Sequence, residues 1–238
     1  MTHPPGRLDL RELVLLYITC IFITCLLLGN LIAGKIAATT IGGYTFIISM
    51  GQLSFPLTFV ITDLLNEYYG IKVARRVTMI GFVMTALAFA IVSSATFIDW
   101  APRAYAPDWK GVPPAAYDQV FASTPRFQIA SMAAYLIAQF LDIGVFHALR
   151  RWTQEKHLWL RATGSTVVSQ LVDTCVVIGI AFGATLPASE LTSMVVSSYL
   201  IKLVVAIAMT PLIYALHSII ERRYHVAPYR HKEQEPVL

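Results

Sequence analysis

The chain has 238 residues, of which 56% are apolar and only 13% are charged, and its mean hydropathy is +0.63. Water-soluble domains rarely have this composition, which argues against a soluble enzyme or a soluble binding module. The net charge of +4 arises from 18 Lys and Arg against 14 Asp and Glu, and the cations stand in groups of two to four beside apolar segments. Nucleic-acid binding needs a longer basic face, so we expect a lipid bilayer and no nucleic acid as the partner.

Six apolar segments follow one another along the chain, each about as long as the ~20 residues that an α-helix needs to cross a bilayer. They are residues 13–33, 46–67, 77–98, 127–149, 163–186 and 191–217. We predict an all-α membrane protein, a bundle of six transmembrane helices over residues 13–217, with cytoplasmic segments at 1–12 and 218–238. No small-residue cleavage site follows the first segment, so we expect it to be retained as a span.

The Lys and Arg residues predict the orientation, because short cytoplasmic loops are enriched in them. Most lie at the N-terminus, in the second and fourth loops and in the tail: Arg7, Arg11, Lys72, Arg75, Arg76, Arg150, Arg151, Lys156, Arg161, Arg222, Arg223, Arg230 and Lys232. The first, third and fifth loops hold Lys35, Arg103, Lys110 and Arg126. We therefore expect both termini in the cytoplasm.

The second segment contains Pro56 and ends in three polar residues, Asp63, Asn66 and Glu67. Proline should interrupt this helix, so we expect an irregular outer half where the segment lines a cavity. Asp63 and Glu67 are four residues apart on one helical face, with Asn66 within reach of Asp63. They are candidate binding residues, or interfacial charges that pair with the basic residues of the second loop.

The fourth and fifth segments each carry an amide followed three residues later by an acid: Gln139 with Asp142, and Gln170 with Asp173. Residues at this spacing project from one side of a helix, so each pair can present an amide and a carboxylate together. Such pairs suit a planar solute with both donors and acceptors. Interhelical hydrogen bonding is the alternative interpretation of so short a repeat.

Asp173 and Lys202 are ionisable residues near the middle of their spans, roughly 15 and 16 Å deep at 1.5 Å per residue. Burying such groups in hydrocarbon costs about 2.5 to 3.5 kcal/mol even on lenient scales, so we predict that they pair. The pair is either part of a binding site or an ion pair that fixes helix packing. Asn30 and Lys35, at the outer end of the first span, are supporting candidates, and Lys35 can snorkel to the surface.

Small residues recur at four-residue spacing in two spans, as in Ala130, Ala134 and Ala138 and in Gly179-x-x-x-Gly183. Such faces allow helices to pack closely, within one chain or in a homodimer. The three cysteines all lie in predicted spans and form no Cys-x-x-Cys or Cys/His cluster. We expect no metal ion and no cofactor.

Three stretches carry a resemblance to a known family: residues 29–35, residues 55–70 from Phe55-Pro56 through Asp63 to Gly70, and residues 169–174. In them the chain resembles the queuosine precursor transporter, or vitamin-uptake-like, family of bacterial inner-membrane proteins. The resemblance implies import of 7-deazaguanine bases, such as preQ0 and preQ1, across the bacterial cell inner membrane. The middle stretch is the most specific of the three.

A deazaguanine presents ring N–H and amine donors beside a carbonyl, which a carboxylate together with an amide can recognise. The predicted substrate-binding residues are Asp63, Asn66, Glu67, Gln139, Asp142, Gln170 and Asp173. The predicted supporting residues are Asn30, Lys35, Phe55 and Lys202. No residue is assigned a catalytic role.

Three alternatives remain open at this point. The chain resembles in span number the substrate-capture subunits of vitamin importers, which dock on a separate energising complex. A second alternative is an intramembrane enzyme that uses Asp63, Asp142 or Asp173 as acid and base. The third is an assembly protein whose buried charges only direct helix pairing.

Overall fold

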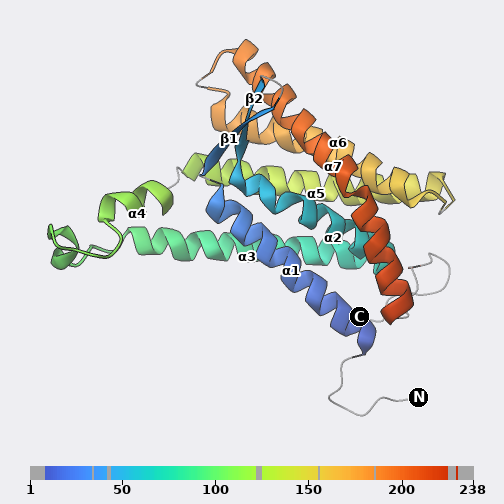
Figure 1. Cartoon of the computed structure of the whole chain (residues 1–238). Coiled ribbons are helices and arrows are strands. Elements are labelled where there is room, and N and C mark those ends of the chain that lie inside the picture. The colour runs from blue at the N-terminus through green and yellow to red at the C-terminus, as the bar shows by residue number, and fades with distance from the viewer. Residues whose placement is uncertain are drawn as a thin grey trace.

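The computed structural model describes residues 9–33, 35–41, 44–121, 125–154, 156–184, 186–224 and 229. The predicted cytoplasmic residues Arg7, Arg230 and Lys232 lie outside this part of the chain, as does Gly34 of the first family-like stretch. Helices α1 (Leu10–Ile32), α2 (Phe55–Tyr68), α3 (Gly70–Thr96), α5 (Pro125–Trp152), α6 (Leu158–Phe182) and α7 (Ala188–Tyr224) form the body of the molecule (Figure 1).

Five of these helices are long and apolar enough to cross a bilayer: those covering Leu10–Ile32, Gly70–Thr96, Gln128–Trp152, Leu158–Phe182 and Ala188–Arg222. They correspond to the first, third, fourth, fifth and sixth predicted spans. Helix α1 begins with a capping box, in which the Asp9 side chain accepts from the helix and Glu12 accepts from the Asp9 N–H at 3.0 Å. The five long apolar helices confirm the prediction of a helical membrane protein.

The second predicted span, residues 46–67, is not one continuous helix, and the irregular part expected before Pro56 is present and lines a cavity. Its first residues belong to strand β2 (Tyr44–Ser49), a 3-10 turn η1 (Met50–Leu53) follows, and α2 has only 14 residues. At 1.5 Å per residue α2 is about 21 Å long, shorter than the ~30 Å hydrocarbon layer. Pro56 stands at the start of α2, where its missing N–H costs nothing, so proline begins this helix instead of kinking it.

A β-hairpin between α1 and η1 was not predicted. Strand β1 (Ile36–Ile41) pairs with β2 in antiparallel register, from Ile36 opposite Ser49 to Ile41 opposite Tyr44. The strands are rich in Ile, Thr and aromatic residues, which favour extended backbone. A shorter 3-10 turn η2 (Pro102–Tyr105) and helix α4 (Pro114–Phe121) form the excursion after α3.

Helix α2 lies at the centre of the bundle and packs against α1, α3, α5 and α7. Every residue from Val60 to Tyr68 is buried, including the polar Asp63, Asn66 and Glu67. The long helices instead expose large apolar side chains to the outside, such as Ile129 and Val204. Polar groups inside and apolar groups outside are the arrangement expected of a protein surrounded by lipid.

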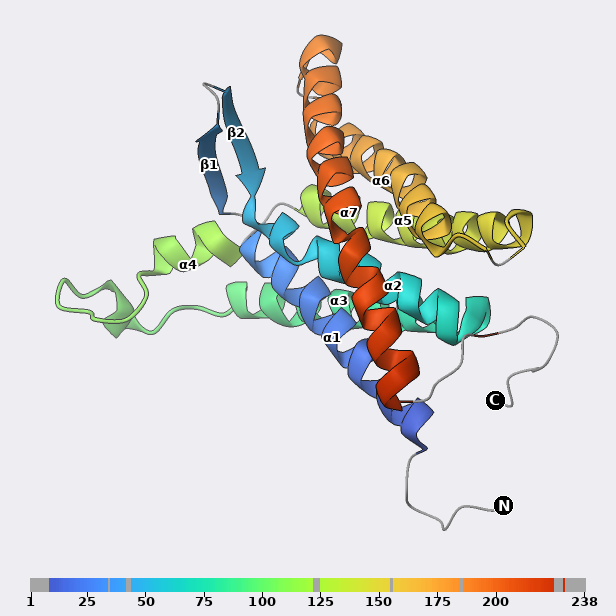
Figure 2. The same cartoon turned by 45° about the vertical axis from the view of Figure 1, so that its right-hand side comes forward.

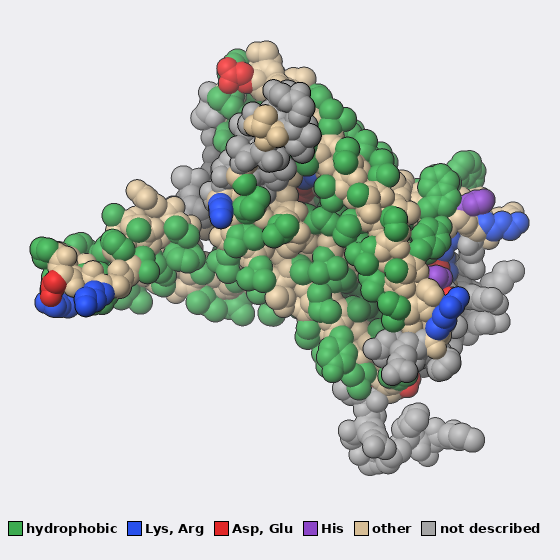
Figure 3. Space-filling view, in the orientation of Figure 1, with side chains coloured by type: hydrophobic (Ala, Val, Ile, Leu, Met, Phe, Trp, Pro, Cys, Tyr) green, Lys and Arg blue, Asp and Glu red, His purple; other side chains and the backbone are tan. Residues whose placement is uncertain are grey.

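The space-filling view agrees with this arrangement. Hydrophobic side chains cover most of the central face, and most of the Lys and Arg atoms in view lie toward its two ends (Figure 3). The start of α1, the α2–α3 junction, the α5–α6 turn and the end of α7 lie on one side of the molecule in both cartoon views. The hairpin, the α3–α4 connection and the α6–α7 turn lie on the opposite side (Figure 2).

Candidate functional site

A cavity of about 210 Å³, here called the polar cavity, lies at the centre of the bundle, with side chains from η1 and from every long helix around it. Its lining includes Asn30 of α1, Gln52 of η1, Phe55 and Phe59 of α2, Phe82 of α3, Gln139 of α5, Gln170 and Asp173 of α6, and Lys202 of α7. Three of the seven predicted binding residues and three of the four predicted supporting residues therefore meet around one space.

The two glutamines of the polar cavity have unused hydrogen-bonding capacity. The Oε1 atom of Gln139 accepts from the Thr62 hydroxyl at 3.3 Å, and no hydrogen bond of its amide nitrogen occurs within the described residues. The Oε1 atom of Gln170 is buried without a hydrogen-bond partner in the same part of the chain. A buried amide that lacks a partner favours a ligand that supplies one.

Asp173 and Lys202 form the predicted ion pair. The ammonium of Lys202 lies 2.6 Å from Oδ2 of Asp173, donates also to the Thr174 hydroxyl at 3.3 Å, and lies 5.5 Å from the centroid of the Phe55 ring. The Lys202 side chain keeps 13% of its surface exposed and the Asp173 side chain keeps 11%, so the pair borders open space. An ion pair beside a cavity can exchange one partner for a ligand without any rearrangement of the helices.

The outer wall of the polar cavity depends on a close approach of α1 and η1. A Cβ on Gly29 would lie 2.5 Å from the Ser54 Oγ, and one on Gly51 would lie 2.7 Å from the Gly29 carbonyl oxygen. Backbone atoms therefore leave no room for a Cβ at Gly51, whereas at Gly29 the nearest atom is a side-chain hydroxyl that can rotate away. Beside them, the Asn30 side chain accepts from the Ser131 hydroxyl at 3.2 Å, which ties α1 to α5. Lys35 is exposed next to the hairpin and does not line the cavity.

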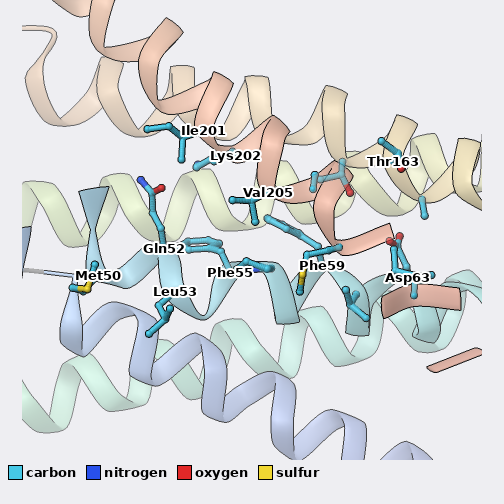
Figure 4. A pocket seen from close by; sticks show the side chains of 17 residues that line it. Met50, Gln52, Leu53, Phe55, Phe59, Asp63, Thr163, Ile201, Lys202 and Val205 are labelled. Atoms are coloured by element: carbon cyan, nitrogen blue, oxygen red, sulfur yellow. The ribbon is translucent and has the colours of Figure 1, made fainter. Parts of the chain in front are cut away.

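A second cavity of about 270 Å³, here called the apolar cavity, lies between α2, α6 and α7. Most of its lining is hydrophobic, and Gln52, Phe55, Phe59 and Lys202 border both cavities. Figure 4 shows Lys202 near one end of the apolar cavity and Asp63 near the other. Among the predicted binding residues, Asp63 therefore borders this second space and not the polar cavity.

The remaining predicted residues, Asn66, Glu67 and Asp142, line neither cavity. Asp142 is 2% exposed and accepts from the Ser169 hydroxyl at 3.1 Å. Glu67 forms a buried ion pair with Arg161, whose Nη2 lies 2.6 Å from Oε1, and Arg150 lies 3.9 Å from Oε2. Of the two alternatives for Glu67, pairing with the basic residues of the second loop does not occur in the structure, because α5 and α6 bring guanidinium groups to it instead.

We name the group Asn66, Glu67, His147, Arg150 and Arg161 the charged cluster. The Nε2 atom of His147 lies 3.2 Å from Oδ1 of Asn66, and Arg150 donates to the Asn66 carbonyl at 3.4 Å. Tyr229 contacts the charged cluster through its backbone: its N–H donates to the Glu67 carbonyl at 2.8 Å, and its carbonyl accepts from Arg150. The polar cavity and the charged cluster thus differ, because open space adjoins the ion pair of the first and protein groups surround the charges of the second.

Sequence reasoning placed Arg150 and Arg161 in a cytoplasmic loop and did not single out His147. The structure buries all three at 5%, 3% and 5% exposure. At 3.6 residues per turn, His147 lies about 140° around the helix from Asp142, and Arg161 lies about 180° from Gln170, so neither continues the face of a recognised pair. Arg150 and Arg161 lie just outside the predicted spans 127–149 and 163–186, and a search extended past the span ends would have included them.

The small-residue faces have different surroundings. Ala130, Ala134 and Ala138 are buried at 5% or less within the chain, where α5 packs against its neighbours. Gly179 is exposed, and a Cβ there would meet nothing within 4 Å. The alanine face is therefore used inside one chain, the glycine face is exposed, and the homodimer stays a prediction.

Comparison with known proteins identifies the family. The profile of the family described as "Putative vitamin uptake transporter" matches residues 49–216. A "Probable queuosine precursor transporter" from Bacillus subtilis is 31% identical over 182 residues, which cover 76% of each chain. The "Queuosine precursor transporter" of Escherichia coli is 34% identical over 58% of this chain and 56% of that protein.

A third relative, from Haemophilus influenzae and named "Probable queuosine precursor transporter", is 32% identical over 58% of this chain and 54% of its own length. No solved structure was found that matches the chain. The profile match covers most of the chain, including every residue of the polar cavity except those of α1. The chain therefore belongs to the vitamin uptake transporter family and is a multi-pass membrane protein.

Proposed function

We propose that this protein imports queuosine precursors, 7-deazaguanine bases such as preQ0 and preQ1, across the bacterial inner membrane. The observation that carries the proposal is the polar cavity, where Gln139, Gln170 and Asp173 surround a space of about 210 Å³. That volume is below the ~300 Å³ at which drug-sized pockets begin, and it suits a single bicyclic base. Three relatives named for queuosine precursors support the choice of substrate.

The chemistry of the lining matches the edges of such a base. The carboxylate of Asp173 accepts from adjacent ring N–H and amine donors, while the amide nitrogen of Gln139 donates to the carbonyl. The buried Oε1 of Gln170, which has no partner among the described residues, accepts a further N–H. Phe55 offers a ring face on which a flat heterocycle can stack. Asn66, Glu67 and Asp142 are left out of this proposed site, since they do not reach the cavity.

Lys202 is proposed to hold Asp173 ionised while the cavity is empty. Its ammonium is 2.6 Å from the carboxylate, and it borders both cavities, so it can turn away from Asp173 without leaving open space. Donors of the base then take its place on the carboxylate. An arriving base with an aminomethyl group brings its own ammonium, which replaces the charge of Lys202 as well.

Six membrane crossings with both termini in the cytoplasm are part of the proposal. Helix α2 and η1 together carry the chain from the hairpin side to the α2–α3 junction, where Lys72 follows. A short, interrupted helix of this kind is tolerated where it is surrounded by protein and lines a cavity. The side with both described chain ends also holds the basic α5–α6 turn, which agrees with the enrichment of cations in cytoplasmic loops.

The proposal assigns transport and no catalysis to this chain. Two further arrangements are distinguishable by simple measurements. A capture subunit would copurify with ATPase subunits and would not support uptake alone. An intramembrane enzyme would convert a deazaguanine base into a new compound when incubated with purified protein.

The test is uptake of labelled deazaguanine bases by cells that lack their own importer and cannot synthesise queuosine. We expect uptake with this protein and background levels without it. The Asp173→Asn variant should reach the membrane in normal amount and give background uptake, because its amide replaces one of the two acceptor oxygens by an NH2 donor. Absence of uptake by the wild-type protein, with membrane insertion verified, would contradict the proposed function.

A further inference from the structure

Two buried carboxylates, Asp63 and Asp142, lie beyond the polar cavity toward the charged cluster. Two direct contacts between α2 and α5 bracket them, Thr62 to Gln139 at 3.3 Å and Asn66 to His147 at 3.2 Å. Asp63 directly follows Thr62, and Asp142 is three residues after Gln139. The two acids therefore face the same interhelical layer and act on each other electrostatically.

Each acid has an oxygen atom without a partner. Within the described residues, Oδ1 of Asp63 and Oδ2 of Asp142 are fully buried and accept no hydrogen bond. Both residues are 2% exposed. Ser165 and Ser169 of α6 face Asp142, but the Ser169 hydroxyl is bound to its other oxygen, Oδ1. An ionised carboxylate in such a layer would be expected to have donors at both oxygens, and each of these two keeps one oxygen without a donor among the described residues.

The surrounding charges leave the layer one positive charge short. On α2 itself Glu67 is a third acid, and it already engages Arg161 of α6 at 2.6 Å and Arg150 of α5 at 3.9 Å. Across the apolar cavity, Lys202 of α7 is bound to Asp173. Among the described residues of this layer, three carboxylates thus face two guanidinium groups, while the His147 imidazole contacts Asn66.

The other elements against α2 add no cation to the pair. Arg11 of α1 donates to the Tyr68 carbonyl at 2.6 Å, and His217 of α7 contacts the Tyr68 hydroxyl at 2.6 Å, both one turn or more beyond Asp63. From α3, the described contact in this region is the Thr78 carbonyl, which accepts from Tyr135. A small cation that enters the layer can supply the third positive charge.

We propose that Asp63 and Asp142 together hold one proton, and that the protein carries this proton inward with its substrate. The inference rests on the proposed function and adds its energy source. Carboxylates that interact in a dry site do not both stay ionised, and one proton on the pair removes one of the two buried negative charges. The apolar cavity gives that proton a route, because Asp63 borders it together with Thr163 and Thr166.

The same contacts link the proton to the substrate. Thr62 donates to Gln139, which lines the polar cavity, and each of these residues is within one helical turn of an acid of the pair. A base that recruits the Gln139 amide changes the contact that holds α2 and α5 together at the level of Asp63 and Asp142. Binding of substrate and binding of the proton therefore act on one interhelical layer, which is the physical requirement for coupling.

The experiment uses the purified full chain in proteoliposomes, with an uncharged deazaguanine base and the membrane potential clamped. Exchange of labelled base at equal pH on both sides tests transport alone. An acid-outside pH gradient should then drive accumulation of at least about threefold in the wild-type protein. Asp63→Asn and Asp142→Asn should keep exchange but lose this accumulation. Glu190→Gln, an exposed acid at the start of α7, is the control that should keep both.

The outcomes separate the two claims. Exchange without pH-driven accumulation in the wild-type protein would overturn proton coupling and leave transport standing, and accumulation driven by sodium instead would show a different cation. Loss of accumulation in His147→Gln but not in Asp63→Asn would assign the proton elsewhere. If both Asn variants lost exchange as well, these acids would belong to the substrate site or to the fold. Absence of exchange in the wild-type protein would remove the proposed function together with this inference.

Discussion

The polar cavity and the charged cluster both bury ionised side chains inside a membrane bundle, but they differ in what surrounds the charges. Asp173 and Lys202 have one ion-pair contact at 2.6 Å and border about 210 Å³ of open space. Glu67 is shared by Arg161 and Arg150, is 4% exposed and lines neither cavity. A buried charge is therefore a candidate for binding when space adjoins it, and a packing element when other protein groups fill that space.

The charged cluster should give the largest effect on stability. Arg161→Met removes the main partner of Glu67, and breaking a buried pair from one side costs about 3 to 5 kcal/mol. Unfolding of the purified protein in detergent, followed by circular dichroism, should show this loss. The double variant Arg161→Met with Glu67→Gln should be less destabilised than the single one, because no buried charge is left alone. Equal stability of the single variant and the wild type would contradict the packing role.

Lys202→Met should separate function from stability. Its ammonium borders two cavities, so water can reach Asp173 when it is removed, and the loss of stability should be clearly smaller than for Arg161→Met. Uptake should fall at least about tenfold, since Asp173 then lacks the cation that keeps it ready for substrate donors. Uptake at the wild-type rate would show that the pair is only an element of packing.

The two glutamines should have graded effects on substrate affinity. A single hydrogen bond contributes a net ~0.5 to 1.5 kcal/mol, which is roughly twofold to tenfold in affinity. Gln170→Ala and Gln139→Ala should each raise the half-saturating concentration of uptake by such a factor. Gln128→Ala, in the first turn of α5 and outside the lining of both cavities, is the matched control and should not change it.

Gly51→Ala should lower uptake less than any of the changes above. Its main effect should be a loss of stability. The added Cβ would lie 2.7 Å from the Gly29 carbonyl oxygen and 2.9 Å from Cβ of Ala33, so α1 and η1 must separate. Overpacking of this kind costs about 1 to 3 kcal/mol. Gly144→Ala, inside α5 where a Cβ would meet nothing within 4 Å, should not destabilise the protein, because alanine favours a helix over glycine. Similar unfolding curves for both variants would argue against the close approach at Gly51.

Much of the fold follows from composition alone, because hydrocarbon permits few backbone conformations. Long apolar runs must be helical, and five of the six predicted spans correspond to long helices. The exception is residues 46–67, where the apolar run contains both a strand and a short helix. A run of Ile, Phe and Thr has the same hydropathy in either conformation, so the hairpin was beyond a hydropathy argument.

The part of the candidate site that could be predicted is the pairing of two ionisable residues that lie at the same depth in neighbouring spans. Asp173 and Lys202 are ionisable residues at similar depth in successive spans, and the structure confirms their pairing. Glu67 lay near a predicted span end, where several cations were within reach along the sequence. Its true partners, Arg150 and Arg161, come from α5 and α6, and only the packing of these helices on α2 selects them. Depth can be read from a sequence, but the choice among partners at one depth cannot.

Equilibrium binding of a deazaguanine base to the purified protein tests the central claim most directly, because it reports on the polar cavity without the transport cycle. We predict one saturable site per chain, with affinity at least about tenfold weaker in Asp173→Asn and nearly unchanged in Asp63→Asn. Calorimetry on the detergent-solubilised protein would measure this. Wild-type affinity in Asp173→Asn would contradict the account, because the substrate would then bind somewhere other than the polar cavity.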